Sequence, residues 1–306
     1  MNTKDVNNLL LCDPVTGICE VPSAQVSVTE HNGAEKKKPV QLLYFTDPIC
    51  SSCWGIEPQL RKLKREYGNY FDIEYRMGGL LPSWDSYGGR DVRHPADVAH
   101  HWDEVSAYYD MPIDGNLWLE DPLSSSYPPS IAFKAAQLQG EVKALTFLRR
   151  IKEMVFVEKK NIAKWEHLQQ AALETGLDTE KLKGDIDGKA KELFNEDLKL
   201  AKSLSVRGFP TLFFTDEEYN RLRVYGVKPY EHFEQTLLTL YPQAVKTPVD
   251  TDDEHVLAHY PTVTTKEFSL LTNRTKEAAE SILNSLFEKG KIEKYTTKNG
   301  TLWKRK

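Results

Sequence analysis

Two cysteines separated by two serines stand in the segment PICSSCWGIEP, which covers residues 48 to 58. A C-x-x-C pair at the start of a helix is typical of thiol–disulfide chemistry, because the unpaired N–H groups and the helix dipole stabilise a thiolate there. On this interpretation the pKa of Cys50 is lowered, Cys50 is the reactive thiol and Cys53 resolves the mixed disulfide. A metal clip, or a pair retained without chemistry, is the alternative.

The surrounding pattern predicts the elements that hold this pair. Residues 40 to 48, VQLLYFTDP, are an almost continuous apolar run that predicts a buried strand. The segment after Cys50 has apolar residues at helical spacing as far as Gly68, and Pro58 is expected to kink this helix. FDIEYRM at 71 to 77 alternates as a second strand. The order strand, helix, strand predicts a parallel pair joined by a right-handed crossover.

The middle of the chain is predicted to be helical, and strands return after it. Residues 95 to 203 carry apolar residues at three- and four-residue spacing. TLFFT and LRVYGV, separated by DEEYN, predict a hairpin, and an amphipathic helix follows it up to 242. Pro210, in VRGFPT, stands immediately before the hairpin. A cis Phe209–Pro210 bond there would expose backbone beside the two sulfurs.

Both ends of the chain differ in character from this central part. Residues 1 to 39 are polar and predict a flexible tail that carries Cys12 and Cys19. Residues 243 to 261 contain the acidic stretch DTDDE and predict a linker. Residues 262 to 306 predict two short helices and a hairpin with an Asn-Gly turn, which is the pattern of a small winged-helix-like α+β domain.

Charge and hydropathy limit the classes of function. The net charge is −5, so the whole chain is not a general partner for nucleic acid. Residues 262 to 306 carry ten Lys or Arg and five Asp or Glu, but the second helix of this segment is balanced in charge, which favours a protein contact or a role in supporting the fold over DNA binding. No apolar run is long enough to span a membrane, and no signal peptide is evident, so we expect a cytoplasmic protein.

Taken together, these motifs resemble a known fold and family. The strand, C-x-x-C-W, Pro58, the helical insertion and G-F-P-T resemble the DsbA-like thioredoxin fold over about residues 40 to 242. FTDPICSSCWGIEPQLRKLKREYG, the tail segment LCDPVTGICEVP and the appended C-terminal domain are similar to the YjbH family of Firmicutes. The resemblance implies an α/β fold class: a thioredoxin domain with a helical insertion at about 95–203, plus the winged-helix-like domain at 262–306.

The resemblance also implies a function. Members of this family are cytoplasmic adaptors that bring the transcription regulator Spx to the ClpXP protease, so we expect a non-enzymatic protein without a cofactor that contacts Spx and ClpX and serves a stress response. The alternative is a cytoplasmic thiol–disulfide oxidoreductase that uses Cys50 and Cys53 with cis Pro210. A modulatory role of the pair under oxidative stress lies between the two.

Two further sets of residues are candidate sites. The loops at 80–89 and 117–129 are rich in aromatic residues and proline, and Trp84 and Tyr87 are the candidate partner anchors. Half-buried core aromatics are the equal alternative. Cys12 and Cys19 are seven residues apart without a flanking histidine, which favours an unliganded pair, while the cysteine- and histidine-rich tails of relatives keep zinc open.

Overall fold

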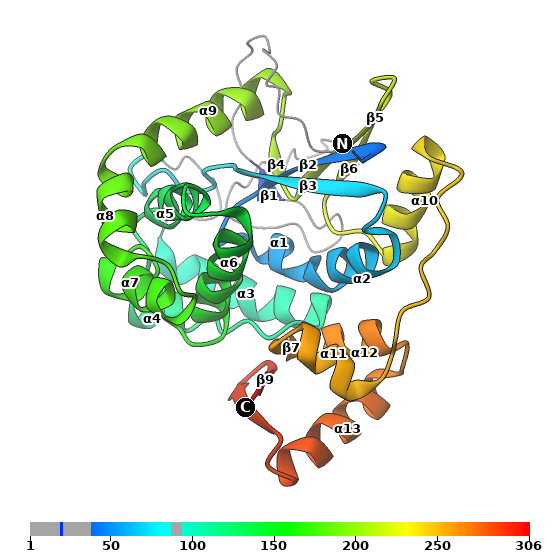
Figure 1. The fold of residues 1–306 in the computed structure, drawn as a ribbon. Helices are drawn as coiled ribbons and strands as arrows, with labels where there is room; N and C mark the ends of the chain where they lie inside the picture. The colour runs from blue at the N-terminus through cyan, green and yellow to red at the C-terminus, as the bar shows by residue number, and fades with distance from the viewer. Residues whose placement is uncertain (1–18, 21–37, 87–93) are drawn as a thin grey trace, which may run out of the picture.

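The computed structural model describes residues 19–20, 38–86 and 94–306, and a four-stranded sheet forms its centre (Figure 1). The strand order is β3-β2-β5-β6. Its members are β2 (Val40–Thr46), β3 (Phe71–Met77), β5 (Thr211–Asp216) and β6 (Arg221–Tyr225). Strand β2 runs parallel to β3 and antiparallel to β5, which runs antiparallel to β6. The predicted parallel pair and the predicted hairpin are therefore both present and lie in one sheet, and the predicted thioredoxin-like α/β class is confirmed.

Helices cover both faces of this sheet, which explains the unbroken apolar run in β2. Residues such as Leu42 and Tyr44 point to one face and are buried against α2 (Glu57–Tyr67) and α10 (Tyr230–Leu240). Phe45 points to the other face, into the core of the helical insertion. Successive side chains of a strand point to opposite faces, so a strand covered on both sides must be apolar throughout.

The helical insertion forms the largest core and is anchored to β3 by a buried carboxylate. The insertion consists of α3 (Pro95–Tyr109), α4 (Leu117–Glu120), α5 (Tyr127–Gln137), α6 (Glu141–Phe156), α7 (Trp165–Glu174), α8 (Thr179–Asp187) and α9 (Lys189–Ser203). Asp197 of α9 accepts a hydrogen bond from the backbone of Met77 at 2.9 Å and pairs with Arg76 at 2.8 Å and Lys134 at 2.9 Å.

None of the helices in the described ranges is long and apolar enough to cross a membrane.

The helix that carries the C-x-x-C motif is interrupted, as Pro58 predicts. Helix α1 spans Ser51–Gly55, Ile56 stands between the two helices, and α2 begins at Glu57 with Pro58 in its first turn. Proline has no N–H to donate, and it fits the first turn of a helix, where that N–H would lack an intrahelical partner. The break makes α1 a short element of its own.

A third core lies in the C-terminal domain, which packs beneath α2 (Figure 1). The predicted two helices and hairpin are present, with additional elements before them. Helix α11 lies inside the segment predicted as a linker, and its Val256 and Leu257 are buried in the third core, so the connection is shorter than expected. The elements are α11 (Asp253–His259), β7 (Thr262–Thr264), α12 (Thr265–Thr272), α13 (Lys276–Glu288), β8 (Ile292–Thr297) and β9 (Gly300–Arg305), with sheet order β7-β9-β8.

Part of the segment predicted as a flexible tail forms a strand. Strand β1 (Cys19–Glu20) pairs antiparallel with β4 (Gly208–Phe209). The bond that follows β4, Phe209–Pro210, is cis, as the sequence predicts. Strand β4 thus links the tail to the strand that enters the main sheet.

The packing of Phe209 predicts an effect on stability at Gly78. A Cβ atom at Gly78 would lie 1.8 Å from the ring of Phe209, whereas one at Gly184 in α8 would meet nothing within 4 Å. We expect Gly78→Ala to lower the free energy of unfolding by at least about 2 kcal/mol through overpacking, and Gly184→Ala to raise it by up to about 1 kcal/mol. Denaturant unfolding measures both changes. A neutral Gly78→Ala would contradict the placement of Phe209.

Candidate functional site

The two cysteines of the C-x-x-C motif lie together at the start of α1 and are fully buried. Cys50 is the N-cap residue, and its Sγ accepts a hydrogen bond from the backbone N–H of Cys53 at 3.1 Å. Both residues carry thiols, and neither has any solvent-exposed surface. The structure therefore brings the predicted pair together, but it shields both sulfurs from solvent.

Burial reverses the pKa order that the sequence predicts. Burial, the hydrogen bond with Cys53 and the charge of Asp47 raise the pKa of Cys50 well above its ordinary value. Burial also acts on Cys53, but the hydrogen bond from Cys50 and the charge of Lys152 outweigh it, so the pKa of Cys53 is lowered. The expectation of a low pKa at Cys50 is wrong, because one N-cap hydrogen bond at a short helix does not offset complete desolvation. Of the two thiols, that of Cys53 therefore has the lower pKa.

A buried carboxyl group stands beside the pair. Asp47 follows the end of β2 and accepts hydrogen bonds from the backbone of Ile49 at 3.1 Å, the backbone of Leu80 at 2.7 Å and the hydroxyl of Ser126 at 2.8 Å. Burial nevertheless raises the pKa of Asp47 to about 6, because these three bonds only partly compensate for the lost solvation. The loop that leads into Cys50 is thus held by a group that can change its charge near neutral pH.

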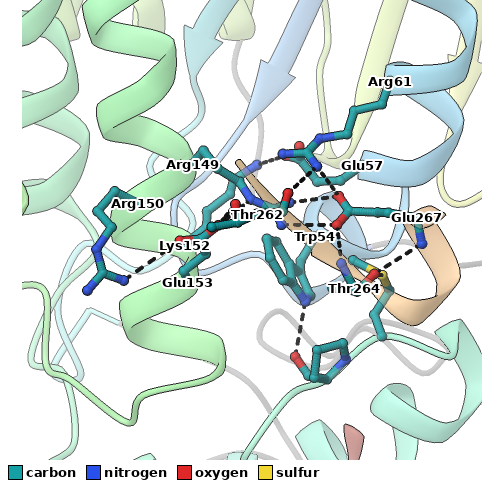
Figure 2. Close-up of polar contacts among 12 residues, drawn as sticks. Trp54, Glu57, Arg61, Arg149, Arg150, Lys152, Glu153, Thr262, Thr264 and Glu267 are labelled. Carbon is teal, nitrogen blue, oxygen red and sulfur yellow. Dashed lines mark hydrogen bonds and ion pairs between the residues drawn. The ribbon is translucent and has the colours of Figure 1, made fainter. Parts of the chain in front are cut away.

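Trp54, directly after Cys53, connects the dithiol to the rest of the molecule (Figure 2). Its indole N–H donates to the carbonyl of Pro112 at 3.1 Å, and its ring stacks on Phe156 with centroids 5.5 Å apart. The guanidinium of Arg149, from α6, lies over the same ring at 4.4 Å. The ring of Trp54 in C-x-x-C-W therefore packs against the guanidinium cation of Arg149.

Arg149 joins the thioredoxin domain to the C-terminal domain. Its two terminal nitrogens bind the carboxylate of Glu267 at 2.8 and 3.0 Å, and its Nε binds Glu153 at 2.7 Å. The side chain of Glu267 is completely buried. Burial disfavours the cation, but the charges of Glu267, Glu153 and Glu57 hold the pKa of Arg149 above its usual range, so it stays charged. A bidentate pair of this kind fixes orientation as well as distance.

The position of Glu267 is set by a capping box at the start of α12. The backbone N–H of Thr264 donates to Glu267 at 2.7 Å, and the backbone N–H of Glu267 donates to the Thr264 hydroxyl at 3.1 Å. That hydroxyl also contacts the sulfur of Met111, in the thioredoxin domain, at 3.2 Å. Arg61 of α2 adds a hydrogen bond to the Thr262 carbonyl at 2.9 Å. Two domains are thus joined by fully partnered polar groups.

A groove of about 680 Å³ opens beside this junction. One wall is α6, with Leu145 and Arg150, and the other is the sheet of the C-terminal domain, with Leu302 and Lys304. Tyr295, about half exposed, stands on β8 at the groove. The groove is accessible to a partner, whereas the two sulfurs are not.

The remaining predicted site residues have different outcomes. Trp84 is half-buried, donates its indole N–H to the Leu123 carbonyl at 2.8 Å and packs edge-on against Trp118. This contact supports the core alternative for Trp84, while Tyr87 lies outside the described residues. Cys12 does as well, so zinc binding stays a prediction. In the part of the chain that the structure describes, no group of three or more His, Cys, Asp or Glu is placed to hold a metal ion.

The comparisons with known proteins agree with this architecture. The thioredoxin family model matches residues 43–235. The protein named ClpXP adapter protein SpxH of Halalkalibacterium halodurans is 34% identical over 300 residues, which is 96% of each chain. The protein of the same name in Bacillus subtilis is 32% identical over 279 residues, with 90% of this chain and 92% of the relative covered.

Solved structures with similar folds are named as thiol enzymes. A putative protein disulfide isomerase from Nitrosomonas europaea has a TM-score of 0.58 and 22% identity over 67% of this chain and 98% of its own. The cytosolic disulfide reductase DsbM from Pseudomonas aeruginosa has a TM-score of 0.53 and 23% identity over 65% of this chain and 99% of its own. At these identities the similarity establishes the fold alone.

The ion pair across the junction predicts a large effect of a small substitution. Glu267→Gln keeps the capping box, because glutamine also fits it, but leaves the mostly buried Arg149 cation without its main counter-charge. We expect the free energy of unfolding to fall by about 3 kcal/mol. The exposed pair of Glu254 with Lys291 gives the control, and Glu254→Gln is expected to cost less than about 1 kcal/mol. Equal losses in denaturant unfolding would contradict the role of Glu267.

Asp47 predicts a pH dependence of stability. Its folded pKa of about 6 exceeds the unfolded value of 3.8, so its contribution is fully present below pH 4 and is lost as the pH rises through 6. This loss corresponds to about 3 kcal/mol. The difference in unfolding free energy between wild type and Asp47→Asn should change by about that amount from pH 4 to pH 7. Parallel pH profiles would show that Asp47 keeps an ordinary pKa.

Proposed function

This chain belongs to the SpxH family of ClpXP adapter proteins, and on that basis we propose that it is a cytoplasmic adaptor that binds the transcription regulator Spx and increases its degradation by the ClpXP protease. The proposal needs no cofactor and no chemical step on the partner. The thioredoxin domain and the C-terminal domain together form the binding platform.

The observation that carries the proposal is the buried junction between the two domains. An adaptor must hold its partner in one orientation relative to the protease, so its own parts must not move independently. The bidentate pair of Arg149 with the buried Glu267, over the ring of Trp54, supports such a rigid platform. The burial of Cys50 and Cys53 argues in the same direction, because a disulfide of a folded protein cannot reach either sulfur without a local opening.

We place the partner-binding surface at the groove between α6 and the C-terminal sheet. The sheet order β7-β9-β8 leaves one edge of β8 without a partner strand among the described residues. Three successive β8 residues, Glu293 to Tyr295, line the groove, so the first half of the strand borders it. An extended segment of a partner can add to such an edge through main-chain hydrogen bonds.

Side chains at the groove would give this contact its affinity. Tyr295 offers an aromatic anchor, and Leu302 adds apolar surface to the same wall. Lys304 places a cation beside them, whereas the guanidinium of Arg150 is paired with Glu158 and Glu174. Aromatic anchors with polar surroundings are the common composition of binding hot spots. Trp84, with its indole N–H bound and its ring packed on Trp118, has less surface to offer.

The test is reconstituted degradation of Spx by purified ClpXP, with and without this protein. We expect acceleration by the wild type and by Cys50→Ser/Cys53→Ser. Tyr295→Ala should weaken the binding of Spx about 30-fold, since a buried aromatic anchor contributes about 2 kcal/mol. Tyr219 is exposed at the distant β5–β6 turn with a φ of 65°, so Tyr219→Asn, which tolerates this backbone, is the matched control and should bind normally.

Each outcome of this experiment distinguishes between two functional hypotheses. No acceleration by the wild type contradicts the adaptor function. Acceleration that vanishes in the folded double serine variant favours the oxidoreductase alternative. Equal binding by the Tyr295 and Tyr219 variants would move the partner surface away from the groove.

A further inference from the structure

A second pocket, with a volume of about 420 Å³, lies at the end of α2. Three segments form its wall: Lys64 and Arg65 belong to the last turn of α2, Thr247 to the connection after α10, and His259 to the end of α11. Figure 1 shows this connection running from α10 past α2 to α11. The pocket shares Tyr260 with the groove and no other lining residue.

Basic side chains line this pocket, and none of its described lining residues is acidic. Lys64, Arg65 and His259 contribute the basic groups. The carboxylate that pairs with Lys64, that of Asp72 at 3.5 Å, is shared with Lys38 at 2.7 Å. One negative charge between two ammonium groups leaves the pocket with an excess of positive charge.

Two pKa shifts have the sign that such an excess produces. Burial and the charge of Lys38 lower the pKa of Lys64. Burial and the charges of Arg65 and Arg61 lower the pKa of His259. A neighbouring cation lowers the pKa of a basic group because it disfavours a second positive charge. An anion bound in the pocket would relieve both repulsions.

The guanidinium of Arg65 is only partly hydrogen-bonded. Its Nη2 donates to the backbone carbonyl of Asp250, whereas its Nη1 is buried and has no hydrogen-bond partner among the described residues. The carboxylate of Asp250 accepts from the backbone N–H of Asp252 at 2.8 Å and pairs with His255. A basic residue at the end of a helix complements the helix dipole, but the dipole gives Nη1 no acceptor. A buried charged donor without an acceptor costs free energy, which an anion beside Arg65 would recover.

We propose that this pocket binds a phosphate group, which Arg65, Lys64 and His259 hold. Three basic groups around one pocket suit a ligand with about two negative charges and several acceptor oxygens, which a phosphate group has at neutral pH. The planar fork of a guanidinium matches phosphate oxygens, and an ammonium adds a point charge. The group is either free inorganic phosphate or the phosphoryl group of a small ester, since both present the same oxygens.

A phosphate group in this position would connect α2 with α11. The backbone N–H of Thr247 donates to the carbonyl of Glu66 at 2.8 Å, so the connection is already fixed to α2 beside the pocket. The bound group would add a contact between the thioredoxin domain and the C-terminal domain. This inference goes beyond the adaptor function and does not depend on it, because the Tyr295 anchor takes no part in the pocket.

Isothermal titration calorimetry of the full chain with inorganic phosphate, at constant ionic strength, tests the site. We expect one saturable site with a Kd of about 1 mM or lower. Arg65→Gln should weaken binding at least about tenfold, because a hydrogen bond between charged groups is lost, and Lys64→Gln about threefold. Lys199 is exposed on α9, so Lys199→Gln removes the same charge elsewhere and should bind phosphate like the wild type.

Thermal unfolding provides a second measurement. Without phosphate it verifies that each variant is folded, and Lys64→Gln carries the comparison if Arg65→Gln is not. With phosphate it should show a stabilisation of the wild type that is smaller in the variants of the pocket, because a ligand that binds the folded state stabilises it.

A parallel titration with AMP distinguishes the two sources of the phosphate group. Tighter binding of AMP than of inorganic phosphate supports an ester as the ligand, and binding that is no tighter supports free phosphate. The absence of saturable binding of either probe below about 10 mM would overturn the proposal. Equal affinities of the wild type and the folded pocket variants would overturn it as well, because phosphate would then bind elsewhere.

Discussion

The arrangement of the molecule depends on one mostly buried cation, the guanidinium of Arg149, which lies between an aromatic ring and a carboxylate and has a side chain only 12% exposed. The guanidinium of Arg149 lies over Trp54 and binds both oxygens of Glu267, so three elements from two domains meet at one group. Removing one partner would leave a buried charge uncompensated, and this penalty is larger than the attraction of an exposed pair. The bidentate contact therefore fixes the orientation of the C-terminal domain relative to the thioredoxin domain. Because Trp54 follows Cys53 directly, the same contact relates the dithiol to the C-terminal domain.

The two cysteines stand at the start of a helix, as in a redox motif, but they are buried like core residues. The C-x-x-C start of α1, the cis Phe209–Pro210 bond and the thioredoxin-like fold are all present. Complete burial, however, raises the pKa of Cys50 and leaves Lys152 to stabilise the thiolate of Cys53. Such a pair is poorly suited to attack an external protein disulfide.

Local sequence patterns predicted the fold well, whereas the sequence contained no pattern that predicted contacts between residues far apart in the chain. The apolar run of β2, the C-x-x-C motif and Pro58 each act within a few residues, and each gave the right element. Arg149 and Glu267 are far apart in the chain and look like ordinary charged helix residues, although T-x-x-E marks a capping box at α12. The pKa order depends on burial, which position at a helix start does not reveal. Helix α11 was missed because the acidic stretch resembled a linker, while Asp252 in fact caps this helix.

We expect the two domains to unfold as one cooperative unit because the buried junction joins them, and native-state hydrogen exchange tests this most directly. The amides of Leu42 and Tyr44 in β2 report on the thioredoxin domain, and those of Leu271 in α12 and Leu302 in β9 report on the C-terminal domain. We expect all four amides to exchange with the free energy of global unfolding. If Leu271 and Leu302 exchange through an opening whose free energy is several kcal/mol below that of global unfolding, while β2 stays protected, the two domains do not unfold as one unit.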